Sequence, residues 1–308
     1  MRLPSSASSG FVLAVDFGGT KIALAAADVD GMFLASTRID TKAEHGATQA
    51  VERALAEAER LVRRVEGECL AAAAVSPGVV RGDRVLLAPN VPGWEELSLP
   101  TELREALGVA RVEVGNDVKA AALAEARWGS LRGADPGVLL NLGTGVAVGI
   151  VTGGEVLEGA NGAAGEIAYS LRTPADGRGA ADGHAPLEEV VGGRAIGERA
   201  SRLLGTTLDA AEVFARDDGP ARSLLDEALA ELAMHVANLA TLLDPARIAV
   251  GGGLMGSSET ILPVLAERLR SAVPFPPELV PATFVHDGPL RGAVALAVDA
   301  VAQVEVAR

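Results

Sequence analysis

One short pattern occurs twice in this chain: an apolar run of β type ends in glycine and threonine, and a second apolar run follows at once. The first copy is VLAVDFGGTK at residues 12–21, and the second is VLLNLGTG at residues 138–145. Each copy predicts a strand, a tight turn and another strand, because glycine allows a sharp turn and a close approach to a ligand. The N–H groups of such a turn and the threonine hydroxyl can bind an anion. We therefore expect the two turns to hold a polyphosphate between two halves of the protein.

The order of the predicted elements also repeats. A predicted β-meander over residues 11–40 is followed by helical and strand segments, and a second meander over residues 136–154 begins the same order again. A chain of 308 residues is long for one core, so the repeat predicts an α/β protein of two lobes, each a mixed sheet flanked by helices, with the active site in the cleft. We expect a disordered tail at residues 1–10, a small N-terminal lobe over 11–132 and a larger C-terminal lobe over 133–308. The last helix is expected to pack back on the first lobe.

Charge and composition exclude several classes of partner. The net charge of −14 argues against nucleic acid and against an anionic membrane surface. No apolar stretch reaches the ~18 residues that cross a membrane, and the start of the chain lacks the apolar core of a secretion signal. The single cysteine, Cys69, excludes an internal disulfide and a multi-cysteine metal site, and we expect a cytoplasmic protein.

An acidic residue precedes the first of the two turns. Asp16 is expected to organise Mg²⁺ through water, while Thr20 and the amides of Gly18 and Gly19 hold phosphate oxygens. The alternative is an ordinary hairpin turn with a solvated aspartate, and the second turn at residues 143–145 favours the functional interpretation. The Walker pattern is absent, which excludes a P-loop enzyme.

A second aspartate, Asp117, follows a predicted strand at residues 112–114 and opens a predicted helix over residues 117–128. The more common role of an aspartate at this position is to cap the helix. The functional alternative is a general base aimed into the cleft. Such a base needs no raised pKa, because the hydroxyl proton leaves late in a loose phosphoryl-transfer transition state.

Further polar residues lie in loops rich in glycine and proline. Asn90, Glu166 and Glu188 suit a neutral polyol, because each can bond two hydroxyls, although solvated loop residues are an equal alternative. The segment GGGLMG at residues 251–256 matches the pattern G-x-G-x-x-G, but only 52 residues follow it, which disfavours a dinucleotide-dependent oxidoreductase. It is either a turn under an adenine or ribose or a plain strand–helix turn. The four histidines show no ligand spacing, so no metal–histidine site is expected.

In their order and spacing, these segments resemble the ROK family of sugar kinases, within the actin/hexokinase-like ATPase superfamily. The resemblance extends from residue 11 to about residue 298 and is carried by DFGGTK (16–21), SPG (76–78), PNVPGW (89–94), ND (116–117), LGTG (142–145), GAAGEI (162–167) and GGG (251–253). It implies the two-lobed actin/hexokinase-like fold and ATP-dependent, Mg²⁺-assisted phosphorylation of a primary hydroxyl on a hexose-like sugar, as in a glucokinase. The family tendency, together with a long leucine stripe over residues 225–243, also implies a homodimer.

The resemblance further implies a role for each matching position. Asp117 takes the place of the catalytic base. Sugar contacts fall on Gly78, Asn90, Asn116, Glu166 and Glu188. The residues in the phosphate-binding places are Gly18, Gly19, Thr20, Lys21, Gly143, Thr144 and Gly145. Those on the adenosine side of the nucleotide are Gly251, Gly252 and Gly253.

The chain departs from the family pattern at two places. The family usually has a histidine three residues after the glutamate of its GEIGH segment, and Tyr169 stands there instead. A cysteine-rich zinc loop usually follows, but residues 176–184 hold no cysteine, so no structural zinc is expected. Because the missing histidine would touch the sugar near its anomeric end, an N-acetylhexosamine or a cyclitol (a pseudo-sugar) is kept as an alternative acceptor. Tyr169 could stack on the sugar ring or donate one hydrogen bond to it.

A non-catalytic sugar sensor of the same fold is the remaining alternative. The pair formed by Asn116 and Asp117 argues against it, because a sensor needs no base. Members of the family that act as repressors carry an N-terminal helix-turn-helix, and only about ten residues precede the first predicted strand. We therefore expect no repressor role.

Overall fold

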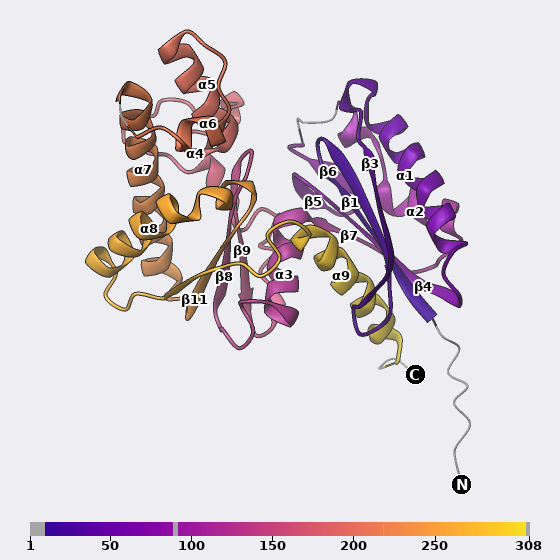
Figure 1. The fold of residues 1–308 in the computed structure, drawn as a ribbon. Coiled ribbons are helices and arrows are strands. Elements are labelled where there is room, and N and C mark those ends of the chain that lie inside the picture. Colours follow the sequence, from indigo (N-terminus) through magenta and orange to yellow (C-terminus); the bar gives the residue numbers. More distant parts are fainter. Residues whose placement is uncertain (1–9, 89–91, 218, 306–308) are drawn as a thin grey trace. The chain divides into compact units, whose positions relative to one another are not determined.

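The computed structural model describes residues 10–88, 92–217 and 219–305. They form two compact units: the first holds the described residues up to Ala124 and from Asp287 onward, and the second holds those between Glu125 and His286. Figure 1 shows the helices and strands of each unit. Residues 1–9 of the predicted disordered tail lie outside the described residues, and Gly10 begins the first strand. Within the described part of the chain, no helix is both long enough and apolar enough to span a membrane.

The first unit is built on a five-stranded mixed sheet with the order β3-β2-β1-β4-β7. The strand β1 pairs antiparallel with β2 and parallel with β4, and β4 pairs parallel with β7. The elements of this unit are β1 (Gly10–Phe17), β2 (Lys21–Ala27), β3 (Phe33–Asp40), α1 (Ala47–Val62), β4 (Glu68–Ser76), β5 (Val79–Arg81), β6 (Arg84–Leu86), α2 (Leu99–Leu107), β7 (Val112–Asn116), most of α3 (Asp117–Trp128) and α9 (Gly288–Glu305).

Helices cover both faces of the first sheet (Figure 1). On one face, the buried side chains of α1, among them Ala54 and Leu61, pack against Phe11 and Leu13 of β1. On the other face, α9 contacts β1 and β4. A Cβ atom added to Gly292 in α9 would lie 2.0 Å from the carbonyl oxygen of Ala120, so only glycine allows α9 to approach α3 this closely.

The second unit holds a sheet of the same design, with the order β10-β9-β8-β11-β12. The strand β8 pairs antiparallel with β9 and parallel with β11, just as β1 does with β2 and β4. Its elements are β8 (Gly137–Leu142), β9 (Val146–Thr152), β10 (Glu155–Val156), α4 (Glu188–Val191), α5 (Gly193–Leu204), α6 (Ala210–Phe214), α7 (Gly219–Leu243), β11 (Arg247–Gly251), α8 (Ser258–Ala272) and β12 (Glu278–Pro281). The α/β fold with two mixed sheets flanked by helices, expected from the sequence, is thus confirmed.

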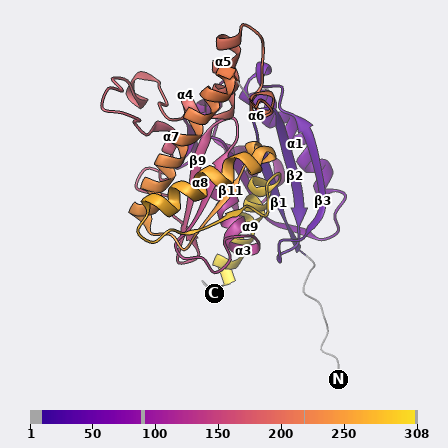
Figure 2. The same ribbon diagram turned by 60° about the vertical axis from the view of Figure 1, so that its left-hand side comes forward.

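The long helices α7 and α8 close the core of the second unit. Figure 2 shows them lying beside β9 and β11. Leu225 and Leu232 of α7 and Leu265 of α8 are buried in one cluster with Leu140 of β8 and Val250 of β11. The leucine stripe therefore packs on the sheet of its own unit, at a gain of roughly 1.5–3 kcal/mol for each leucine side chain that is fully buried.

Candidate functional site

Three predicted segments of the first unit meet at one edge of its sheet. The strands β1, β4 and β7 are parallel neighbours, and the register pairs Asp16 with Val75 and Val75 with Gly115. The turn after β1, residues 76–78 after β4 and Asp117 after β7 consequently lie at the same, carboxyl edge of these strands. In parallel α/β sheets this is the edge at which ligands bind.

The turn between β1 and β2 is tight. A Cβ atom on Gly18 would lie 2.7 Å from the carbonyl oxygen of Lys21, so this position requires glycine. The ammonium group of Lys21 pairs with the carboxylate of Asp40, the residue opposite it on β3. This hydrogen bond and the lysine charge lower the pKa of Asp40.

Asp16 and Asp117 are two partly buried carboxyl groups that influence each other. Burial raises the pKa of Asp16 to about 7; the charge of Asp117 adds to this shift, and the charge of Arg38 opposes it. Burial also raises the pKa of Asp117 to about 6. The backbone N–H of Val118, which donates to the Oδ1 atom of Asp117 at 2.8 Å, partly offsets this shift by lowering the pKa. Neighbouring carboxylates that lose solvation suit a hard cation such as Mg²⁺, which supplies the missing positive charge.

Asn116 caps the helix that Asp117 opens. Its Oδ1 atom accepts a hydrogen bond from the backbone N–H of Lys119 at 2.9 Å, and its Nδ2 atom donates to the carbonyl oxygen of Gly78 at 2.8 Å. Gly78 has φ +105°, and a Cβ atom there would lie 2.5 Å from the carbonyl oxygen of Leu86. Asn116 thus fixes the start of α3 to the loop after β4, and the carboxylate of Asp117 is not the group that caps α3.

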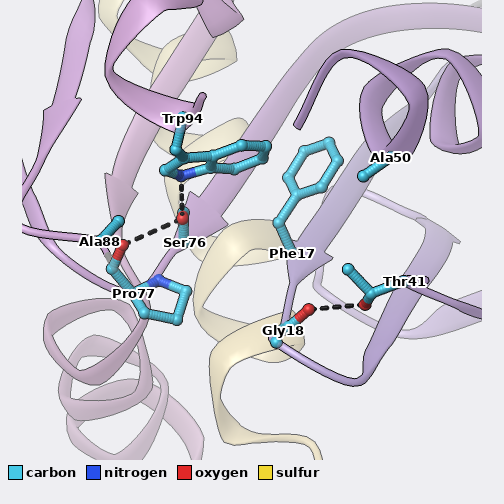
Figure 3. Close-up of a pocket in the computed structure, with 9 residues that line it drawn as sticks. Phe17, Gly18, Thr41, Ala50, Ser76, Pro77, Ala88 and Trp94 are labelled. Carbon is cyan, nitrogen blue, oxygen red and sulfur yellow. Dashed lines mark hydrogen bonds between the residues drawn. The ribbon is translucent and has the colours of Figure 1, made fainter. Parts of the chain in front are cut away.

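A small apolar pocket lies beside the turn after β1 (Figure 3). The indole N–H of Trp94 donates to the hydroxyl of Ser76 at 2.6 Å, and that hydroxyl donates to the carbonyl oxygen of Pro77 at 3.0 Å. The ring of Phe17 meets that of Trp94 edge to face, with centroids 5.2 Å apart. The residues that line the pocket are Phe17, Gly18, Gly19, Thr41, Ala50, Ser76, Pro77, Ala88 and Trp94. The sequence had indicated Gly18 and Gly19 as binding residues but none of the others.

In the second unit, the turn at Gly143, Thr144 and Gly145 joins β8 to β9. The carbonyl groups of this turn face the start of α5. The N–H of Gly193 donates to the carbonyl oxygen of Gly143 at 2.9 Å, and the N–H of Arg194 donates to that of Thr144 at 3.1 Å. A Cβ atom on Gly193 would lie 2.6 Å from the Gly143 carbonyl oxygen. Glycine at this position therefore lets the turn rest directly on the helix.

The turn at residues 251–253, which is predicted to bind the adenosine side of the nucleotide, lies next to the predicted phosphate turn at residues 143–145. The register pairs Gly251 at the end of β11 with Asn141 of β8. Gly252 has φ +91°, and a Cβ atom there would lie 2.3 Å from the carbonyl oxygen of Leu142, one residue before Gly143. Gly253 begins the short helical turn that precedes α8. The second unit therefore brings the two predicted nucleotide turns together.

Three predicted sugar residues of the second unit also cluster. The pKa of Tyr169 is raised by burial first and then by the charges of Glu166 and Glu188. Glu188 accepts a hydrogen bond from the N–H of Val146 at 3.1 Å, and a Cβ atom on Gly145 would lie 2.0 Å from its Oε2 atom. The carboxylate of Glu188 consequently links the predicted sugar residues to the phosphate turn.

The loop around residues 176–184, where no structural zinc is expected, is held by hydrogen bonds of its own. Asp176 accepts from the N–H groups of Arg172 at 2.6 Å and Thr173 at 3.2 Å. The Nδ1 atom of His184 lies 2.9 Å from Oε1 of Glu189. Among the residues that the structure describes, no group of three or more His, Cys, Asp or Glu side chains could hold a metal ion.

The predicted site residues thus form two groups, one in each unit. The first unit carries Asp16, Gly18, Gly19, Thr20, Lys21, Gly78, Asn116 and Asp117, and the second carries Gly143, Thr144, Gly145, Glu166, Tyr169, Glu188, Gly251, Gly252 and Gly253. Asn90, the remaining predicted sugar residue, lies outside the described residues.

Comparison with known sequences points to one family. The family model described as ROK family matches residues 12–300. The bifunctional enzyme NanE/NanK of Brucella melitensis is 33% identical over 298 residues, which cover 93% of this chain and 54% of that protein, so this chain spans about half of its length. The N-acetylmannosamine kinase of Shigella boydii is 31% identical over 302 residues, which cover 92% of this chain and 97% of that protein.

Solved structures give the same result. The ROK hexokinase from Thermus thermophilus is similar with a TM-score of 0.79 and 30% identity, over 96% of this chain and 99% of that one. A ROK family glucokinase from Streptomyces griseus, solved with glucose and AMPPNP, is similar with a TM-score of 0.75 and 28% identity, over 94% of this chain and all of that one (100%).

Proposed function

The chain belongs to the ROK family, and we propose that it is an ATP-dependent kinase that transfers the γ-phosphoryl group to a primary hydroxyl of a hexose-like sugar. One observation carries this proposal: Asn116 supplies the cap of α3 in place of the partly buried carboxylate of Asp117, and that carboxylate lies at the same sheet edge as the glycine turn after β1. The kinases among its relatives support the reaction class, and the AMPPNP complex of the Streptomyces griseus enzyme supports a nucleotide as donor.

Asp117 is the proposed general base. A carboxyl group whose pKa is raised to about 6 is still mostly ionised at pH 7, and it is a stronger base than a solvated aspartate. It accepts the proton of the sugar hydroxyl as the oxygen attacks the phosphorus atom in line. The hydrogen bonds of Asn116 to Lys119 and Gly78 hold the backbone at Asp117, which limits the conformational freedom of the proposed base.

The proposed phosphate ligands are the N–H groups and hydroxyls of Gly18, Gly19, Thr20 and Lys21 in one unit and of Gly143, Thr144 and Gly145 in the other. Gly251, Gly252 and Gly253 take the adenosine side. When Mg²⁺ is bound with the nucleotide, it neutralises charge on the phosphate oxygens, and Asp16 would hold it through water. Asp16 fits this role because its carboxylate lies beside that of Asp117, and a cation would relieve the repulsion between them.

The proposed sugar contacts are Gly78, Asn90, Asn116, Glu166, Tyr169 and Glu188. Tyr169 lies beside the carboxylates of Glu166 and Glu188. A phenol near two carboxylates offers one donor and several acceptors to a polyhydroxyl ligand. The acceptor is glucose or a second candidate, an N-acetylhexosamine or a cyclitol; the N-acetylmannosamine kinase among the relatives favours the N-acetylhexosamine over the cyclitol.

The deciding experiment is a coupled ADP-release assay on the whole chain with MgATP and a panel of hexoses, N-acetylhexosamines and cyclitols. We expect turnover with at least one member of the panel and a loss of at least ~10³-fold in kcat for Asp117→Ala, with sugar binding retained within about tenfold (~1.4 kcal/mol). Glu113→Gln, which removes an exposed carboxylate from β7, the strand that ends just before Asp117, is the matched control and should retain activity. Sugar binding without ADP release would favour a non-catalytic sensor, and full activity of Asp117→Ala would remove this residue from the base role.

We also propose that the protein acts in the cytoplasm as a homodimer and contains no structural zinc. Light scattering on the purified chain tests the oligomeric state. Elemental analysis tests the metal content, and one zinc ion per chain would overturn the interpretation of residues 176–184.

A further inference from the structure

Thr41 lies outside the predicted phosphate-binding segment and yet is bonded to it at two points. Its backbone N–H donates to the carbonyl oxygen of Thr20 at 2.9 Å, and its Oγ1 hydroxyl donates to the carbonyl oxygen of Gly18 at 2.6 Å. Figure 3 shows the second of these bonds at the wall of the apolar pocket. Only 2% of Thr41 is exposed, so water does not compete for its hydroxyl.

The sheet explains why Thr41 reaches the turn. Lys21 and Asp40 are register partners at the ends of β2 and β3, so the bond from Thr41 to Thr20 continues the strand pairing one step further, onto the turn. The side chain of Thr41 then reaches the other end of the turn at Gly18. The two bonds therefore hold both ends of the turn against the end of β3.

Thr41 is itself anchored to α1. The guanidinium group of Arg53, on α1, donates to the Thr41 carbonyl oxygen. Thr41 also lines the pocket, together with Ala50 of α1. The turn is consequently tied through one threonine to a helix of its own unit.

Peptide geometry gives this bond a direct consequence for the turn. In a trans peptide the carbonyl and the N–H point in opposite directions. A hydroxyl that holds the Gly18 carbonyl toward Thr41 therefore turns the N–H of Gly19 away from Thr41. Two successive glycines have little conformational preference of their own, so the hydroxyl removes freedom that a bound phosphate would otherwise have to remove.

We propose that Thr41 is a positioning residue for the nucleotide: its hydroxyl orients the turn after β1 so that the Gly19 N–H is preset to receive a phosphate oxygen. This inference rests on the proposed function, because it takes that turn as a phosphate site. It separates nucleotide binding from sugar binding, since among the described residues the hydroxyl bonds to Gly18 of the turn and to no predicted sugar residue.

The test compares Thr41→Val, which keeps the shape and the backbone bond but removes the hydroxyl, with Thr41→Ser, which keeps the hydroxyl. We expect Thr41→Val to raise the KM for ATP and the Kd for AMPPNP about tenfold (~1.4 kcal/mol) while the KM for the sugar stays within twofold. Thr41→Ser should stay within about threefold of the native protein in all three quantities.

Thr241→Val is the matched control, because the Thr241 hydroxyl also donates to a backbone carbonyl, that of Ala237 at 2.9 Å, but within α7. It should leave the nucleotide constants unchanged. If Thr41→Val does not fold, the pair Thr41→Ala and Thr41→Ser makes the same comparison. Calorimetry with AMPPNP needs no turnover, so it measures the effect separately from catalysis.

The outcomes separate the two claims. A native protein that phosphorylates a sugar, together with a Thr41→Val variant whose nucleotide constants are unchanged, overturns the role of Thr41 alone. Equal losses in sugar and nucleotide binding overturn it as well, because they indicate a general effect on folding. A native protein that binds no nucleotide overturns the proposed function and this inference with it.

Discussion

The side-chain amide of Asn116 donates to the carbonyl oxygen of Gly78 at 2.8 Å and so fastens the start of α3 to the loop that follows β4. The same side chain accepts from the N–H of Lys119 at 2.9 Å. Asn116 is buried, with 6% of its surface exposed, so both bonds are made away from water. One residue thus sets the position of the proposed base and of a proposed sugar contact together.

Replacement of Asn116 should therefore affect both stability and catalysis. Asn116→Ala removes the cap of α3 and the bond to Gly78, and we expect the free energy of unfolding to fall by about 1–3 kcal/mol. Asn116→Asp keeps an acceptor for Lys119 but loses the donor to Gly78, so we expect a smaller loss of stability. Urea unfolding of the two variants measures the difference. Equal losses would mean that the acceptor retained for Lys119 contributes nothing.

The rate should depend on pH through Asp117. Its pKa is raised to about 6 by burial, and the base must be ionised, so kcat/KM should fall as the pH drops through about 6. In Asp117→Glu the acid limb should move, whereas in Glu113→Gln it should stay in place. A profile that is flat from pH 5 to 8 would contradict a base with this pKa.

Asp16 should make the ligand-free protein less stable at high pH. The pKa of its carboxyl group is about 7 in the folded chain, above the ordinary value of 3.8, so the folded state binds more protons than the unfolded state between these values. The contribution to stability is therefore complete below about pH 4 and is lost as the pH rises through about 7.

Asp16→Asn removes the buried charge and should raise the free energy of unfolding at pH 8 by on the order of 2 kcal/mol, while phosphoryl transfer is lost. Denaturant unfolding at pH 5 and pH 8 measures the effect, which should be larger at pH 8. The opposite order would show that the Asp16 carboxylate is stabilised by its surroundings.

Gly165 should tolerate no side chain. It has φ +86°, and a Cβ atom there would lie 1.8 Å from the carbonyl oxygen of Val148. Gly153 has φ +60° but, among the described residues, no atom within 4 Å of the same position. We expect Gly153→Ala to cost about 1–2 kcal/mol from backbone strain alone and Gly165→Ala to cost at least about 4 kcal/mol or to prevent folding. Thermal unfolding compares them, and similar losses would mean that the loop before Glu166 can move aside.

Tyr169 should determine which sugar is preferred. Tyr169→His restores the residue typical of the family, and we expect it to change the ratio of kcat/KM between glucose and an N-acetylhexosamine by about fivefold or more. Tyr169→Phe removes only the hydroxyl and shows whether a hydrogen bond or the ring is responsible. If neither variant changes the ratio, the departure from the family has no effect on specificity.

The sequence predicted the fold well because its strongest signals are local. The apolar runs around the two glycine–threonine turns became β1–β2 and β8–β9. The leucine stripe became α7, although the helix begins at Gly219, ahead of the first stripe residue, because a stripe marks only the buried face and Pro220 is well tolerated in the first turn. An apolar stripe over residues 48–65 also predicts a helix; in the structure this helix, α1, ends at Val62, since helix ends depend on the turn that follows.

The contacts that shape the candidate site were harder to predict because they join segments far apart in sequence. Thr41 reaches Gly18 only because β2 and β3 pair in one particular register. The helix cap was considered for Asp117, but it is made by Asn116, and a shift of one residue lies within the error of locating a helix start from sequence. The roles of the predicted site residues toward sugar and nucleotide remain predictions.

The close packing of Gly292 against Ala120 has a consequence for biosynthesis. The helix that covers one face of the first sheet is encoded more than 160 codons after Ala120. While the ribosome is translating the second unit, β1 and β4 therefore present an apolar surface that α9 has not yet covered. The first unit can therefore complete its core only after the second has been synthesised, and we expect the nascent chain to bind chaperones during that interval.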